Sequence, residues 1–293
     1  MAKFYITTPL YYVNSTPHIG HSYTNIAADV LARFHRRMGD DVYFLTGTDE
    51  HGQKIARAAQ EASLSEKTWT DKMVLVFQRL WKELDISYDD FIRTTEKRHT
   101  DTVKNVLDIL FKNKDIYPDK YSGWYCTPCE TFWTDSQIAD NICPDCKRPV
   151  EKIQEENYFF RLSKYQDWLL DYVRKHPNFI RPVSRYNEVL SFLENNKLSD
   201  LCISRPKQRL SWGIELPFSP DHVTYVWFDA LINYISAVGF GYDQEKFKKY
   251  WPADLHLIGK DILRQHAVIW PIILKALGLE MPRMIFAHGW WMV

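Results

Sequence analysis

Apolar positions in the first third of the chain follow two different spacings. Short apolar runs rich in β-branched and aromatic residues, at 4–10, 42–48 and 91–94, are typical of buried strands. Between them lie longer stretches whose apolar residues recur every three or four positions, which predicts helices. These predicted helices cover 22–38, 53–62, 66–84 and roughly 103–110. Repeated strand–helix units predict a parallel, doubly wound α/β sheet.

The alternation stops after residue 115 and resumes near residue 223. Residues 116–222 are rich in Tyr, Pro and Cys and show no regular strand–helix order. We therefore predict one α/β domain made of 1–115 and 223–293, divided by an inserted domain at 116–222. The later elements are predicted as strands at 223–228, 255–258 and 284–286, and as helices at 229–238 and 261–277.

Charge and hydropathy narrow the class of protein. The 37 basic and 37 acidic residues cancel, so the chain is not a strongly basic nucleic-acid binder. The sequence contains no run of about 18 apolar residues, which predicts no membrane span. Its first residues enter a strand directly and do not resemble a signal peptide. We therefore expect a cytoplasmic protein that does not associate with membranes.

Four of the five cysteines form two Cys-x-x-Cys pairs separated by thirteen residues. The pairs are Cys126 with Cys129 and Cys143 with Cys146, a spacing typical of a structural zinc site with four thiolate ligands. A redox dithiol, an iron–sulfur site and two disulfides of a secreted protein are the alternatives. The fifth, Cys202, is expected to be a small buried apolar residue.

Three segments are expected to meet where the parallel strands end. His18-Ile19-Gly20-His21 stands between the first strand and the first helix, where backbone N–H groups and the helix dipole favour phosphate. The other two segments are 47–52 and 258–261, which carry Asp beside Gly at predicted strand ends. Such carboxylates accept hydrogen bonds from an ammonium or a ribose. Alone, each Asp is more typical of a helix cap, but together with His18 and His21 these segments predict a nucleotide site.

The longer strings around these positions resemble one family. His18 to His21 is similar to the first signature of the class I aminoacyl-tRNA synthetases, and the surrounding strings are similar to the bacterial methionyl-tRNA synthetases. The strings are YITTPLYY from Tyr5, TGTDEHG from Thr46, DFIRTT from Asp90, YVWFDA from Tyr225 and LIGKD from Leu257. The resemblance runs over essentially the whole chain. It implies a Rossmann-like class I catalytic domain split by a zinc-binding insertion.

The resemblance also implies an activity and its residues. The expected reaction is ATP-dependent formation of methionyl-adenylate, followed by transfer of methionine to its transfer RNA. His18 and His21 would be catalytic, and Asp49 would hold the ammonium of L-methionine. The methionine pocket would comprise Leu10, Tyr12, Asp49, Trp227, Ala230, Tyr234, Ile262 and His266. The ATP site would comprise His18, Gly20, His21, Gly259, Lys260 and Asp261, with Mg²⁺ accompanying ATP. The N–H of His266 or the O–H of Tyr12 is expected to donate weakly to the methionine sulfur.

Two features keep other interpretations open. The family's second signature, Lys-Met-Ser-Lys-Ser, does not occur in the sequence, and the anticodon-binding part expected after it is missing. We therefore expect an N-terminal catalytic portion that binds methionine but activates it weakly. The alternatives are another small-molecule nucleotidyltransferase with a His-x-Gly-His turn and a catalytically silent RNA-binding fragment. The basic segment 204–209 is expected to be a surface loop, or else to lie near the transfer RNA acceptor end.

Overall fold

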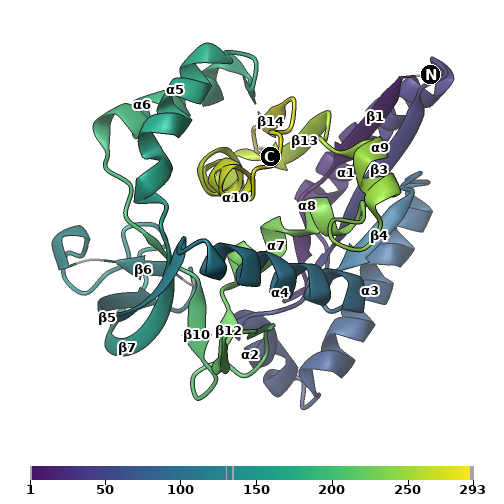
Figure 1. Ribbon diagram of the computed structural model, residues 1–293. Coiled ribbons are helices and arrows are strands. Elements are labelled where there is room, and N and C mark those ends of the chain that lie inside the picture. The colour runs from purple at the N-terminus through teal and green to yellow at the C-terminus, as the bar shows by residue number, and fades with distance from the viewer. Residues whose placement is uncertain (1, 130, 134, 291–293) are drawn as a thin grey trace.

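A parallel sheet of seven strands forms the centre of the protein in a computed structural model that describes residues 2–129, 131–133 and 135–290 (Figure 1). Its strands are β1 (Lys3–Thr7), β2 (Tyr11–Tyr12), β3 (Asp41–Asp49), β4 (Asp90–Arg93), β8 (Ile180–Arg181), β13 (Leu255–Gly259) and β14 (Ile285–His288). The order is β2-β3-β1-β13-β14-β8, and β4 also pairs with β3. Since β1 lies between β3 and β13, the chain moves from β1 first to one side and later to the other. This reversal is where α/β sheets bind ligands.

Helices cover both faces of this sheet. One group consists of α1 (Ile19–Arg37), α2 (Gln53–Glu61) and α3 (Glu66–Glu83). The other consists of α4 (Lys97–Lys112), α7 (Val226–Leu231), α8 (Asn233–Ser236), α9 (Gln244–Tyr250) and α10 (Trp270–Ala276). A 3₁₀ turn (Lys260–Ile262) and a π-helix (Gln265–Ile269) precede α10.

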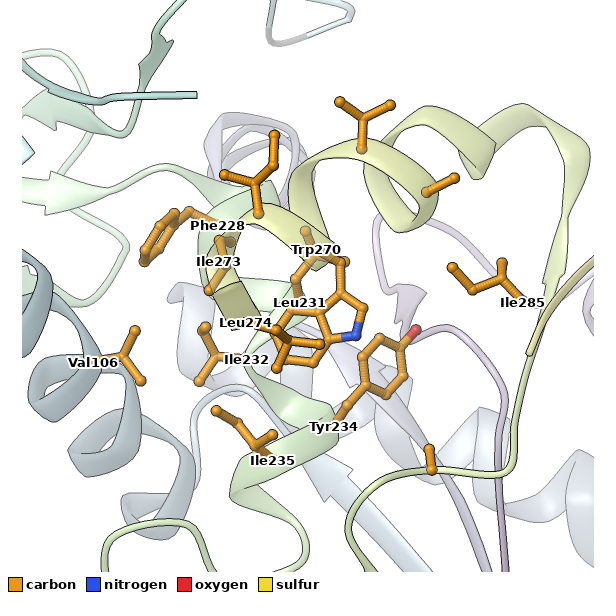
Figure 2. Close-up of a cluster of buried hydrophobic side chains, with 14 of the residues drawn as sticks. Val106, Phe228, Leu231, Ile232, Tyr234, Ile235, Trp270, Ile273, Leu274 and Ile285 are labelled. Atoms are coloured by element: carbon orange, nitrogen blue, oxygen red, sulfur yellow. The ribbon is translucent and has the colours of Figure 1, made fainter. Parts of the chain in front are cut away.

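Alternation along the strands explains why two separate cores form. Tyr5 and Tyr43 belong to a core that includes α4, α8 and α10, whereas Ile6 and Phe44 belong to the core beneath α1 and α3. Successive strand residues face opposite sides of a sheet, so strands buried on both faces need continuous apolar runs. Figure 2 shows part of the first core, where Trp270 and Leu274 of α10 lie near residues of α7 and α8.

The central third of the chain adds smaller elements. These are β5 (Ile116–Cys126), β6 (Thr131–Trp133), β7 (Glu151–Phe160), α5 (Gln166–Lys175), α6 (Val183–Asn195), β9 (Leu201–Cys202), β10 (Ser204–Pro206) and β11 (Glu215–Leu216), with short 3₁₀ turns at Asp135–Gln137 and Ser163–Tyr165. An antiparallel sheet has the order β6-β5-β7-β9, and β10 and β11 flank β12 (Ser219–Thr224). In Figure 1, β5 to β7 lie on the opposite side of the molecule from β1, β3 and β4.

Several predicted elements differ from the structure. The predicted strand at 223–228 is wrong: β12 ends at Thr224 and is antiparallel, and 226–231 is helical. The predicted parallel sheet of the α/β part is confirmed. However, β8, which lies within 116–222, pairs with β14 at its edge. An apolar run of six residues does not distinguish a strand from a buried helix, and Phe228 to Ala230 are buried in a helix here.

The basic segment 204–209 is a surface turn only in its second half: residues 204–206 form strand β10, and residues 207–209 form a turn in which Gln208 is exposed. Ser204 and Arg205 are buried in β10, and the Arg205 guanidinium lies 4.7 Å from the centre of the Tyr225 ring. Arg209 pairs instead with Glu151 and Glu155. Among the residues that the structure describes, no helix combines the length and the apolar character needed to cross a membrane.

Candidate active site

A cavity of about 510 Å³ opens at the carboxyl ends of β1, β3, β13 and β14. The sequence prediction that distant segments meet at this edge is confirmed, since the cavity is lined by residues from each of the three predicted segments. The predicted site residues in its lining are Leu10, Tyr12, His18, Gly20, His21, Asp49, Trp227, Ala230, Tyr234, Gly259, Asp261, Ile262 and His266. Lys260 does not line it; the Lys260 ammonium lies 4.0 Å from the centre of the Trp290 ring.

The two histidines of the first segment form the cap of α1. His18 precedes the helix; its Nδ1 accepts the backbone N–H of Gly20 at 3.1 Å, and the His18 N–H donates to His21 Nδ1 at 3.2 Å. The two imidazole rings stack at 3.8 Å between centres. Burial, with a smaller contribution from the nearby His18, lowers the pKa of His21 to about 4. His21 is therefore neutral at pH 7 and faces the cavity beside the positive end of the helix.

The glycine between these histidines leaves room for the cap. An added Cβ at Gly20 would approach the His18 ring to 3.0 Å. A larger residue would therefore require the exposed His18 ring to shift by a few tenths of an ångström.

The two acids at the end of β3 have different surroundings. Asp49 is buried and lines the cavity, paired in register with Tyr12 of β2. Glu50 is also buried, but it accepts two hydrogen bonds from the Arg93 guanidinium at 2.7 and 2.8 Å. Glu50 therefore holds β3 to β4, and of these two neighbouring acids only Asp49 lines the cavity. The sequence alone did not show that Asp49 and Glu50 have different surroundings.

The apolar end of the cavity contains a fixed hydrogen-bond chain. His266 Nδ1 lies 2.9 Å from the Ile262 carbonyl oxygen and His266 Nε2 lies 2.7 Å from the Tyr234 hydroxyl. Burial lowers the pKa of His266 to about 4, so the ring is neutral and its one proton is on Nδ1. The Tyr234 O–H then donates to Nε2. The expected N–H donation from His266 to sulfur is therefore wrong, because Ile262 accepts that proton.

Behind the cavity wall lies a buried carboxylate that the sequence analysis missed. Asp229 accepts from His51 Nδ1 and from His99 Nε2, each at 2.7 Å, and His99 Nδ1 lies 2.8 Å from Ser236 Oγ. Burial alone would raise the pKa of Asp229, but the two histidines lower it overall. Asp229 neighbours Trp227 and Ala230 on α7, and His51 follows Asp49 by two residues. This network therefore joins two walls of the cavity.

The end of β14 contributes further lining residues that were not predicted. His288 lies at this end, and its Nε2 is 2.8 Å from Thr24 Oγ1 on α1, while Gly289 and Trp290 also line the cavity. The rule that ligands bind beyond strand ends applies equally to the predicted strand 284–286. Applied there, it would have found His288 before the structure was known.

The four paired cysteines gather in one cluster. Their sulfur atoms all lie within 4.8 Å of one another, with Cys126 to Cys146 at 3.4 Å and Cys129 to Cys143 at 3.8 Å. Four thiolates around zinc at about 2.3 Å are about 3.8 Å apart, so the donor set fits a tetrahedral ion. None of the five cysteines forms a disulfide, and Cys202 is buried as expected.

Comparison with known proteins defines the class. A family model described as "tRNA synthetases class I (M)" matches residues 4–153 and 148–293, and the chain belongs to this family. Its Rossmann-like fold agrees with the parallel sheet and the edge-located cavity.

Among curated proteins, this chain is similar to methionine–tRNA ligases. It is 57% identical to that of Caldanaerobacter subterraneus subsp. tengcongensis over 98% of this chain and 45% of the relative. It is 54% identical to that of Thermotoga maritima over 98% of this chain and 46% of the relative. The chain thus spans about half the length of the curated relatives it matches. The structure of Mycobacterium tuberculosis methionyl-tRNA synthetase in complex with methionyl-adenylate matches with TM-score 0.94 and 48% identity, covering 99% of this chain and 57% of that one.

Proposed function

We propose that this chain carries the methionine-activating site of a methionine–tRNA ligase. The site would bind L-methionine and ATP, form methionyl-adenylate and pass the methionyl group to the terminal ribose of transfer RNA. The observation that supports this most is the combination of a buried carboxylate, an apolar aromatic pocket and a histidine-capped helix in one cavity. The methionyl-adenylate carried by the M. tuberculosis relative supports it independently.

The proposed methionine subsite uses both ends of the amino acid. The Asp49 carboxylate would hold the ammonium group through a charge-assisted hydrogen bond. Trp227, Ala230 and Ile262 would surround the side chain, with Leu10 and Tyr12 on the opposite wall. Aromatic and aliphatic groups favour a polarizable thioether. The Tyr234–His266 chain would close the end of the pocket with neutral groups only, which disfavours charged side chains.

The proposed ATP subsite lies at the start of α1 and beyond β13. His18 and His21 would contact the phosphates beside Gly20, and Asp261 near Gly259 would accept from the ribose. The methionine carboxylate would attack the α-phosphorus as pyrophosphate leaves. Such a step requires alignment and charge stabilisation rather than a covalent nucleophile. Mg²⁺ bound with ATP would add charge stabilisation.

We propose that the cysteine cluster holds a structural zinc ion. Four sulfur ligands leave no open position, and the cluster is formed by the turns after β5 and before β7 rather than by the sheet edge. Zinc would therefore hold together the two turns that carry the cysteine pairs and take no part in the reaction.

Calorimetric titration of this chain with L-methionine tests the proposed function. We expect saturable binding of methionine and stoichiometric binding with its adenylate analogue. Asp49→Asn should weaken methionine binding by about tenfold or more, because a hydrogen bond to a charged group contributes about 1.5–3 kcal/mol. Asp243→Asn, on an exposed helix cap away from the cavity, is the matched control. Absence of methionine binding, or equal affinity in Asp49→Asn, would contradict the proposal.

A further inference from the structure

The turn at residues 50–52 leaves the sheet directly after Asp49 and is buried. Glu50, His51 and Gly52 follow the last residue of β3, so their backbone groups lie beyond the ladder of strand hydrogen bonds. Gly52 has a φ of 105°, in the region that favours glycine, and the chain enters α2 there. Buried backbone N–H and C=O groups require partners. The partners of this turn therefore determine how the end of β3 is held.

Trp212 supplies two of these partners. Its indole Nε1–H donates to the Glu50 carbonyl oxygen at 2.5 Å, and its own carbonyl oxygen accepts the Gly52 N–H at 3.3 Å. The centre of its ring lies 5.4 Å from that of the His51 ring. The Thr94 hydroxyl holds the other side of the turn, where it accepts the Glu50 N–H at 2.9 Å. One tryptophan from a distant part of the chain thus contacts all three residues that follow β3.

The segment that carries Trp212 is also attached to the opposite wall of the cavity. Trp212 lies between β10 and β11, and the nearby Ile214 carbonyl oxygen accepts both the N–H and the hydroxyl of Thr224, at 2.7 and 2.8 Å. Thr224 ends β12, which leads directly into α7 (Figure 1). This helix carries Trp227 and Ala230 of the cavity lining. Residues 212–214 therefore connect the end of β3 to the start of α7.

We infer that Trp212 positions the Asp49 carboxylate relative to the methionine side-chain pocket. This inference rests on the proposed function, in which Asp49 holds the ammonium group while Trp227 and Ala230 surround the side chain. Trp212 is not among the described residues that line the cavity, so it acts through the backbone of residues 50–52. When this bond is lost, a smaller fraction of the protein holds Asp49 at the distance from the pocket that methionine requires. The apparent affinity falls in proportion to that fraction.

Two substitutions at Trp212 separate the hydrogen bond from the packing of the ring. Trp212→Phe keeps an aromatic ring but removes the N–H that bonds to Glu50. Trp212→His keeps an N–H, because Nε2 of an imidazole occupies the same ring position as Nε1 of an indole, but it removes the six-membered ring. Loss of packed volume destabilises a protein. We therefore expect Trp212→His to unfold at a lower urea concentration than Trp212→Phe, measured by circular dichroism.

Calorimetric titration with L-methionine at about pH 8, where the introduced imidazole is neutral, tests the inference. We expect Trp212→Phe to bind methionine about fivefold more weakly than the unmodified chain, the factor that corresponds to one hydrogen bond between neutral groups. Trp212→His should stay within about twofold of the unmodified chain although it is less stable. The des-amino analogue of methionine, which cannot use Asp49, should bind Trp212→Phe and the unmodified chain with affinities within about twofold of each other.

Trp251→Phe serves as the control. It also removes an indole N–H that donates to a backbone carbonyl oxygen, that of Glu280 at 3.1 Å, and Trp251 is not among the described residues of the cavity lining. Its methionine affinity should equal that of the unmodified chain. Affinities that follow the stabilities, with Trp212→His binding more weakly than Trp212→Phe, would indicate a structural role only and overturn the inference. Equal losses for methionine and its des-amino analogue in Trp212→Phe, or no loss for either, would also overturn it.

The unmodified chain distinguishes a failure of this inference from a failure of the proposed function. Methionine binding that does not depend on Trp212 would overturn the positioning role alone. Absence of methionine binding by the unmodified chain would overturn the proposed function, and this inference with it.

Discussion

Replacing Asp229 with Asn removes the charge that joins two walls of the candidate active site. Asp229 is fully buried, and its two oxygens accept from His51 and His99 at 2.7 Å each. The amide keeps the shape of the side chain but has one acceptor oxygen in place of two. His99 can adopt the other tautomer, with Nδ1 donating to Ser236, so both contacts can persist as neutral hydrogen bonds.

The expected stability loss follows from these two bonds. A hydrogen bond to a charged group contributes about 1.5–3 kcal/mol and a neutral one about 1 kcal/mol. Losing the charge at both bonds therefore lowers the free energy of unfolding by about 2 kcal/mol in total. Urea denaturation followed by tryptophan fluorescence measures this difference at pH 7.

The effect on binding tests whether Asp229 positions the site. His51 follows Asp49 by two residues, and Asp229 lies between Trp227 and Ala230. Weaker hydrogen bonds to residue 229 would therefore change the distance between the Asp49 carboxylate and the pocket for the methionine side chain. We expect methionine binding to weaken about tenfold, equivalent to about 1.4 kcal/mol. The des-amino analogue of methionine, which cannot use Asp49, should lose much less.

Ser236→Ala is the matched control for this experiment. It removes the far end of the same network but leaves both bonds to Asp229 in place. We expect a stability loss of about 1 kcal/mol with unchanged methionine affinity. Equal losses for methionine and its des-amino analogue in Asp229→Asn, or no loss for either, would refute the positioning role.

Three further predictions follow from the geometry. Burial lowers the pKa of His266 to about 4, so the fold loses stability as the pH falls below about 6.5, the pKa of the unfolded imidazole. Unfolding measured at pH 7 and pH 5 should show that the stability of His266→Gln falls by about 2 kcal/mol less than that of the unmodified chain. An equal fall in stability for both proteins would contradict this prediction. Gly47→Ala would place a Cβ against the Ile92 carbonyl oxygen, so thermal denaturation should show a free energy of unfolding lower by about 3 kcal/mol. Gly289→Ala, where nothing lies within 4 Å of an added Cβ, should change it very little. Cys129→Ser should lose bound zinc in metal analysis while Cys202→Ser retains it; equal zinc content would exclude the four-sulfur site.

Most of the sheet was predictable because its strands and helices leave local periodic patterns. The runs at 42–48 and 255–258 are largely apolar because β3 and β13 are buried on both faces, whereas only Ile92 is buried in the edge strand β4. The error at 223–228 has the same origin. A continuous apolar run indicates burial and not backbone conformation, and Val226 and Phe228 are buried within a helix.

The membership of the site was largely predictable, whereas its internal chemistry was not. Strand-end position and family resemblance together identified Asp49, His18 and His21. They did not reveal that Glu50 pairs with Arg93, or that the Lys260 ammonium packs on Trp290, so that Trp290 and not Lys260 lines the cavity. Adjacent residues of the same chemical type differ only through their neighbours in space.

The sequence by itself determined the periodic elements, the spacing of the paired cysteines and the capping residues at the start of α1, since these are set by positions close together in the chain. Only the tertiary structure determined which side-chain atoms of the candidate site carry protons. The hydrogen bond between His266 and Tyr234, the sharing of Asp229 between His51 and His99, and the meeting of Arg148 with α2 depend on distances between separate segments. Burial and hydrogen bonding set charge states, and both arise only after the chain has folded.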